Sequence, residues 1–178
     1  MPSLASFEAR LSGGHPNSLG NTVSVAHDVI ADRSLLPELI ATYSSDDEVV
    51  RLRVSSALKR VAWAEPRWVH EELDTVIGWV VAIQQPSAQW TIAEILLTLG
   101  PMLSTAQRNR ATELMKAHLS ASEDWIVLIK TMETLANWAK TDPELRAWLP
   151  ERLEQLGREP RKSVAQKARR LNEALSDY

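Results

Sequence analysis

The stretch Ser45–Pro66, SDDEVVRLRVSSALKRVAWAEP, decides the fold because its pattern recurs along the chain. Two aspartates stand before its first turn, where negative charge suits the helix dipole. Glu65-Pro66 predicts where the helix ends, because the residue before a proline disfavours the α region. The apolar residues between these signals have offsets of 0, +4, +7, +8 and +11, which is the spacing of one helix face: Val50, Val54, Ala57, Leu58 and Val61.

The same apolar grid returns three more times. Residues equivalent to Val50 are Ala88, Val127 and Val164, separated by 38, 39 and 37 residues. The helix-start signal Ser45-Asp46-Asp47 also returns, as Ser122-Glu123-Asp124, 77 residues later. Shared spacing of core positions and start signals indicates an array of repeats rather than one amphipathic helix.

The last repeat departs from the grid at one position. The series at offset +8 is Leu58, Leu96 and Leu135, and it ends with Asn172. A terminal repeat has one face without a neighbour, so a polar residue there is expected to be wetted.

Second helices are predicted after the repeated ones, at about 67–82, 104–120 and 144–157, with a closing helix at 162–176. Antiparallel helices joined by short loops at a period of about 40 residues predict an all-α protein. The predicted architecture is an α-solenoid of nine or ten helices wound as a right-handed superhelix. One domain is predicted over 1–178, with an N-terminal helix and loop at 1–20, an irregular first hairpin at 21–44, repeats at 45–84, 85–121 and 122–158, and a capping helix at 159–178.

Composition restricts the function classes. The 178 residues are 44% apolar and 24% charged with a net charge of -3, which is a globular mixture and not a polycation. The absence of cysteine excludes disulfides, thiol catalysis and thiolate metal sites. No secretory signal and no membrane span is expected, so we expect a soluble, cytoplasmic protein without a cofactor.

The first helix of the array resembles a known repeat. Residues 50–58, VRLRVSSAL, are similar to the first-helix pattern of HEAT-type repeats, and residues 164–171, VAQKARRL, resemble it again. The resemblance covers about 21–176 and departs from the pattern at Thr131 and Thr134. Gly13-Gly14 and Ser18-Leu19-Gly20 also resemble the loop of a group of small bacterial HEAT-like proteins that have no assigned function.

The resemblance implies a binding scaffold rather than an enzyme. HEAT-like proteins in general bind other proteins, and a minority act on DNA or modify tetrapyrroles. We therefore expect a non-catalytic protein-interaction scaffold, as a monomer or weak dimer, with an unknown protein partner. The binding surface expected for such an array is the concave side formed by the second helices, around His70, Asp74, Arg108, Arg110 and Arg152.

A basic and aromatic patch is the alternative site. Residues 158–170, REPRKSVAQKARR, carry six cations against one acid, and Arg53, Lys130 and Lys167 share offset +3 in three repeats. Such a column would attract phosphate and favour a nucleic-acid-binding or DNA-repair role. We do not favour it, because no aromatic-basic motif accompanies the charge. The patch would comprise Arg53, Lys130, Lys167, Arg161, Lys162, Arg170 and the exposed Trp125.

The remaining candidates for chemistry are weak. The segment His70-Glu71-Glu72-Leu73-Asp74 begins like a zinc-protease helix but has aspartate where the second histidine must stand, so no metal site is expected. The seven tryptophans are expected mainly in the core and between repeats, with Trp138 on the core grid.

Overall fold

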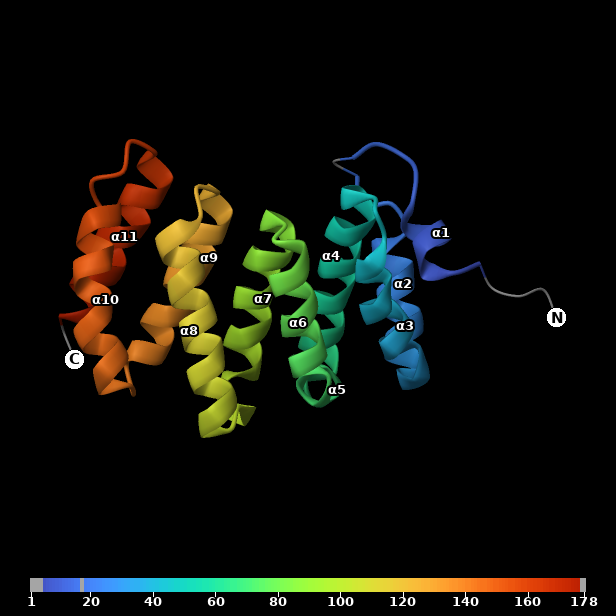
Figure 1. The fold of residues 1–178 in the computed structure, drawn as a ribbon, viewed down its shortest axis with the longest axis horizontal. Coiled ribbons are helices and arrows are strands. Elements are labelled where there is room, and N and C mark those ends of the chain that lie inside the picture. The colour runs from blue at the N-terminus through green and yellow to red at the C-terminus, as the bar shows by residue number, and fades with distance from the viewer. Residues whose placement is uncertain (1–4, 17, 177–178) are drawn as a thin grey trace. The chain divides into compact units, whose positions relative to one another are not determined.

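The computed structural model describes residues 5–16 and 18–176, and every regular element in them is helical. Residues 1–4, 17 and 177–178, which belong to the predicted first and last segments, lie outside this description. The all-α prediction is confirmed (Figure 1). The α-helices are α1 (Phe7–Leu11), α2 (Thr22–Ala31), α3 (Leu36–Ala41), α4 (Glu48–Ala64), α5 (Pro66–Glu71), α6 (Leu73–Ile83), α7 (Pro86–Leu99), α8 (Thr105–Ala121), α9 (Trp125–Ala139), α10 (Pro143–Leu156) and α11 (Lys162–Leu175).

The described residues thus form eleven α-helices, one more than the upper figure of the predicted nine or ten. The extra helix arises because the segment predicted as one helix at 67–82 is divided into α5 and α6 at Glu72. Three short 3₁₀-helices complete the helical part of these residues, at Arg33–Leu35, Thr42–Ser44 and Gly100–Met102.

The repeated start signal forms the same local structure twice. Asp47 Oδ1 accepts the backbone N–H two residues later at 2.8 Å, and Asp124 Oδ1 accepts the equivalent N–H at 2.8 Å. Ahead of them, Ser45 Oγ and Ser122 Oγ accept the N–H of these aspartates, both at 3.2 Å. Each aspartate therefore satisfies donors that the first helical turn leaves unpaired, which explains why the signal recurs.

The apolar grid is the core. Leu171 and Asn172 in the last copy are half-buried, and the other grid positions are buried. Asn172, the polar residue predicted to be wetted in the terminal repeat, is therefore partly exposed. The buried grid residues are Val50, Val54, Ala57, Leu58, Val61, Ala88, Ile92, Ile95, Leu96, Leu99, Val127, Thr131, Thr134, Leu135, Trp138, Val164, Ala168 and Leu175.

The chain divides into two compact units, Met1–Leu99 and Gly100–Tyr178. In the first unit α4 packs against α2 on one side and α7 on the other (Figure 1). In the second unit α9 packs against α8, α10 and α11. In both units a repeated first helix lies beside the next one, α4 beside α7 and α9 beside α11. The single domain and the superhelical arrangement stay predictions.

Membrane insertion of a helix was not expected. Within residues 5–16 and 18–176, no helix is both long and apolar enough to cross a bilayer.

Candidate functional site

The outward face of the first unit carries a groove between α4 and α7. Two adjoining hollows, of about 180 and 280 Å³, share the residues Pro16, Leu52 and Trp90. We call this continuous trough the α4/α7 groove. Leu52 and Trp90 are half-buried, so both retain apolar surface that faces the groove. The further lining residues are Ser18, Leu19, Arg53, Ser56, Lys59 and Thr91 in the smaller hollow, and Glu48, Val49, Gln85, Pro86 and Ser87 in the larger one.

One wall of the groove is the loop at 12–20, which Arg53 holds from below. The Arg53 side chain is 1% exposed. Its guanidinium donates to the backbone carbonyls of Leu11 and Gly13 at 2.6 Å, His15 at 3.0 Å and Ser18 at 3.1 Å. Charge-assisted hydrogen bonds of this kind are stronger than neutral ones, so Arg53 ties Gly13, His15 and Ser18 of the loop to α4.

Gly20 closes this loop where no side chain fits. Its φ of +49° lies in the left-handed region, and a Cβ there would stand 3.1 Å from Arg53 Cζ. Glycine therefore serves both the backbone conformation and the close approach to the guanidinium. Leu19, the residue before Gly20, is 51% exposed and lines the smaller hollow.

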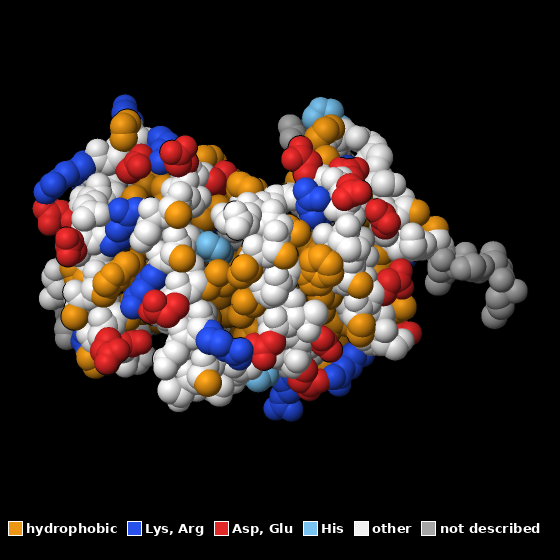
Figure 2. All heavy atoms as spheres, in the orientation of Figure 1, with side chains coloured by type: hydrophobic (Ala, Val, Ile, Leu, Met, Phe, Trp, Pro, Cys, Tyr) orange, Lys and Arg blue, Asp and Glu red, His pale blue; other side chains and the backbone are white. Residues whose placement is uncertain are grey.

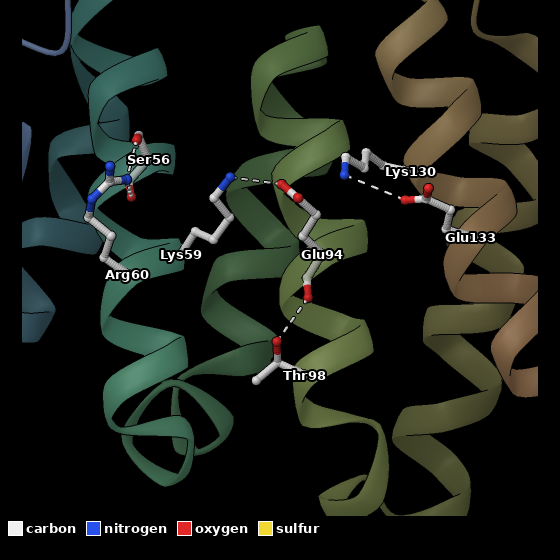
Figure 3. A network of polar contacts seen from close by, with 7 residues as sticks. All are labelled: Ser56, Lys59, Arg60, Glu94, Thr98, Lys130 and Glu133. Atoms are coloured by element: carbon white, nitrogen blue, oxygen red, sulfur yellow. Dashed lines mark hydrogen bonds and ion pairs between the residues drawn. The ribbon is translucent and has the colours of Figure 1, made fainter. Parts of the chain in front are cut away.

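An ion pair crosses the groove floor. Lys59 reaches from α4 to Glu94 on α7, with 2.9 Å between Lys59 Nζ and Glu94 Oε2 (Figure 3). The same ammonium lies 5.2 Å from the Trp63 ring centroid, a cation–π contact. Lys59 is therefore already neutralised by its neighbours.

The wider end of the groove is acidic. Glu48 lines it, and Asp46 and Asp47, the two residues before Glu48 in the sequence, are exposed. The nearby Arg51 donates to Gln85 Oε1 and to the Ser45 carbonyl, both at 2.7 Å, and so contacts no carboxylate in these bonds. Asp47 caps α4, which leaves Asp46 and Glu48 as the carboxylates open to a ligand.

The second unit has a hollow between the corresponding pair of helices, α9 and α11. It measures about 200 Å³ and is lined by Glu133, Ala136, Asn137, Lys140, Leu171, Ala174 and Leu175. In the repeat register most of these positions lie closer to the C-terminal ends of the helices than the lining of the α4/α7 groove does. Lys167 and Glu133 form the cross-helix ion pair of this unit, at 2.5 Å, with the charges exchanged between the helices relative to Lys59 and Glu94. The repeat therefore reproduces neither the position nor the chemistry of the α4/α7 groove.

The predicted concave-side residues are divided between the two units. In the first unit His70 is half-buried in α5 and Asp74 is exposed in α6. In the second unit Arg108 lies in the first turn of α8, whereas Arg152 donates to the Leu119 carbonyl near the end of α8, at 2.7 Å. Eleven residues of helix separate these contacts, about 16 Å at the α-helical rise. Arg110 is exposed on α8.

Two of these arginines have structural partners. Arg152 satisfies carbonyls that the end of α8 leaves open. Arg108 Cζ lies 3.9 Å from the Trp138 ring centroid, so its guanidinium stacks on the indole. Burial lowers the pKa of Arg108, and the nearby Asp142 carboxylate opposes that shift.

The predicted basic and aromatic patch is corrected at Arg53. This residue is buried beneath the 12–20 loop, so it is not part of a surface column. Lys130 and Lys167 are both ion-paired with Glu133, at 3.5 and 2.5 Å. Arg161 pairs with a carboxylate at 2.9 Å, and Lys162, Arg170 and Trp125 are exposed, Trp125 by 49%.

The sequence interpretation missed the two most exposed large apolar side chains among the described residues. Trp63, on α4, is 57% exposed, more than Trp125. Its offset of +13 from Val50 places it at about 220° on the helical wheel, opposite the core grid, and this signal was available in the sequence. The exposure of Leu19 had no such signal, because it depends on how Arg53 holds the loop.

Metal-binding groups add no competing site in the described part of the chain. In each unit, the face shown in Figure 2 mixes basic and acidic side chains. No three or more His, Cys, Asp or Glu side chains within residues 5–16 and 18–176 are placed to hold a metal ion.

In comparisons with known proteins, no family model, no curated protein and no solved structure matches this chain.

Proposed function

We propose that this protein is a non-catalytic protein-interaction module, built as a right-handed HEAT-like solenoid, and that its α4/α7 groove receives a segment of a partner protein. The observation that carries the proposal is an open apolar groove whose wall is already fixed. Leu19, Leu52 and Trp90 offer apolar surface around two hollows. Tryptophan in a concave site is the residue type most often found at the energetic centre of an interface.

The fixed wall favours binding energetically. A loop that must be ordered on binding costs free energy that is subtracted from the affinity. Arg53 contacts the carbonyl of Leu11 at the end of α1 and three carbonyls of the loop, those of Gly13, His15 and Ser18, before any partner binds. A partner therefore meets a preformed site.

A nucleic-acid-binding role has weaker support. Phosphate binding requires cations that exchange small counterions for the ligand. In the predicted patch, Lys130 and Lys167 already share the Glu133 carboxylate and Arg53 is buried. The resemblance to bacterial HEAT-like proteins stays a prediction, and so does a binding surface on the concave side.

Affinity capture with matched surface variants tests the proposal. Full-length protein is immobilised as wild type, Leu19→Asp and Val81→Asp, and exposed to extract of the native host. Leu19 and Val81 are equally exposed, at 51% and 50%, but Val81 lies on α6 away from the groove lining. We expect a protein that the wild type and Val81→Asp retain and Leu19→Asp loses. Retention of the same proteins by all three forms would contradict the groove as the binding site.

Duplex DNA provides the competing measurement. The interaction-module proposal expects no binding, or weak binding, of a random 20-base-pair duplex at 150 mM salt. Binding that weakens steeply as salt rises would support the phosphate-contact alternative instead.

A further inference from the structure

The two hollows of the α4/α7 groove have the size of individual side-chain sites. An engineered cavity of about 150 Å³ is enough to bind benzene in another protein, and the hollows here measure about 180 and 280 Å³. Each therefore has room for one large apolar side chain. Because they share Pro16, Leu52 and Trp90, they are immediate neighbours. Side chains three or four residues apart on a helix are about 5–6 Å apart at Cβ, so one helical turn presents two of them as neighbours on one face.

Charge distinguishes the two ends of the groove. At the smaller hollow, Lys59 is paired with Glu94, and Arg53 is engaged by carbonyls. At the wider hollow, Glu48 is exposed and has no ion-pair partner within the described residues. Asp46 is exposed on the preceding turn. Arg53 at the smaller hollow and Arg51 beside the wider one are hydrogen-bonded to neutral oxygens and keep their positive charge. At the wider end Asp46, Asp47 and Glu48 outnumber Arg51, so the local charge there is negative.

We propose that the partner segment is a short amphipathic helix with two large apolar side chains one turn apart and a lysine or arginine beside the second. The apolar side chains enter the two hollows, and the cation lies against Glu48 and Asp46. This inference rests on the proposed function, because it specifies the chemistry of the segment that the groove receives. It corresponds to the general helix-in-groove mode of recognition, read as apolar anchors at i and i+4.

Three synthetic peptides test the chemistry directly. Each has 12 residues and a fluorescein label, and binding to full-length protein is measured by fluorescence anisotropy. The basic-apolar peptide has two leucines four positions apart and lysines beside the second. The acidic-apolar peptide has glutamates in place of the lysines, and the basic-polar peptide has serines in place of the leucines.

We expect the basic-apolar peptide to bind best. The acidic-apolar peptide should bind about three- to tenfold more weakly, the range expected for charges at an exposed rim. The basic-polar peptide should show no saturable binding, because the apolar anchors supply most of the affinity. Val81→Asp should leave all three results unchanged, and Leu19→Asp should weaken the basic-apolar peptide at least tenfold.

Variants at Glu48 test the charge assignment. Glu48→Gln should reduce the preference for the basic-apolar peptide, and Glu48→Lys should reverse it. Glu48 is the first residue of α4, so circular dichroism must first show that helical content is retained. Glu48→Gln, which removes charge without adding a cation to a helix N-terminus, keeps the test valid where Glu48→Lys does not fold.

Every other outcome overturns the inference. Equal binding of the basic-apolar and acidic-apolar peptides would show that charge does not select the partner. Binding of the basic-polar peptide would show non-specific attraction. No binding of any peptide, while Leu19→Asp still abolishes capture from the extract, would refute this partner chemistry and leave the groove as the interaction site. If no peptide binds and Leu19→Asp still captures the same proteins as the wild type, the proposed function is refuted as well.

Discussion

At the scale of single residues, Arg53 shows how one position changes meaning between sequence and structure. Its offset of +3 places it at the edge of the core face, where burial and exposure are both compatible with the helix. A buried cation is tolerated when hydrogen bonds replace its hydration. The carbonyl of Leu11 at the end of α1 and those of Gly13, His15 and Ser18 in the following loop provide those bonds. The residue that resembled the start of a phosphate-binding column instead shapes an apolar groove.

His118 is the second residue whose burial has a measurable consequence. It is buried in α8, and its Nδ1 has no hydrogen-bond partner among residues 5–16 and 18–176. Burial lowers the pKa of His118 below its ordinary value of 6.5. The folded protein therefore binds the His118 proton less readily than the unfolded chain does.

This pKa shift predicts a loss of stability in mild acid. The contribution of His118 to the free energy of unfolding is fully present above about pH 6.5. It is lost progressively as the pH falls from there to the lower folded-state pKa, because in that window the unfolded chain binds a proton that the folded protein does not. Urea unfolding at pH 7.5, 6.0 and 5.0 should show a smaller decline for His118→Gln than for the wild type. The matched control for loss of a histidine is His27→Gln, at an exposed position on α2. Parallel declines for wild type and His118→Gln would contradict the assignment.

At the scale of elements, the repeated helices owe their form to signals that act locally. Asp47 and Asp124 cap α4 and α9 in the same way, and each is followed by the apolar grid. Capping and periodicity depend on neighbours within a few residues, so the sequence predicted α4, α7, α9 and α11 well. The sequence did not predict the division between α5 and α6, because the residue at the break is Glu72 and not a glycine or proline.

The repeat register predicts that alanine substitutions at equivalent positions of different repeats lower the free energy of unfolding by unequal amounts. Leu96→Ala should lower the free energy of unfolding by about 2–5 kcal/mol, because Leu96 is fully buried and its truncation leaves a cavity. Asn172→Ala, at the same repeat position, should change it by less than about 0.5 kcal/mol, because its side chain is partly wetted. Urea denaturation measures both. Similar costs for the two substitutions would be evidence against the register.

At the scale of the whole molecule, the chain forms two compact units that contain copies of one helical pattern. In a repeat array, stability is close to a sum of repeat terms and nearest-neighbour terms. Damage in one repeat is then felt most by that repeat and its neighbours. A chain with one shared core would instead lose stability uniformly.

Hydrogen exchange of Leu96→Ala distinguishes these cases. Amides of α4 and α7 should lose protection strongly, and amides of α11 should lose little, as expected for the proposed solenoid. Native-state exchange followed by mass spectrometry provides the resolution needed. A uniform loss across α4, α7 and α11 would contradict a repeat array.

The sequence by itself determined the helical class, the helix starts and the core grid, because caps and a 3.6-residue period are local properties of the chain. It also supplied the position of Trp63 on the outer face of α4. The tertiary structure decided what the surface presents. Arg53 became a buried support, Leu19 was placed at a groove rim, and Glu48 was left without an ion pair in the described residues. These outcomes depend on contacts between residues about 30–40 positions apart, such as Arg53 with the 12–20 loop, and no local pattern encodes such contacts.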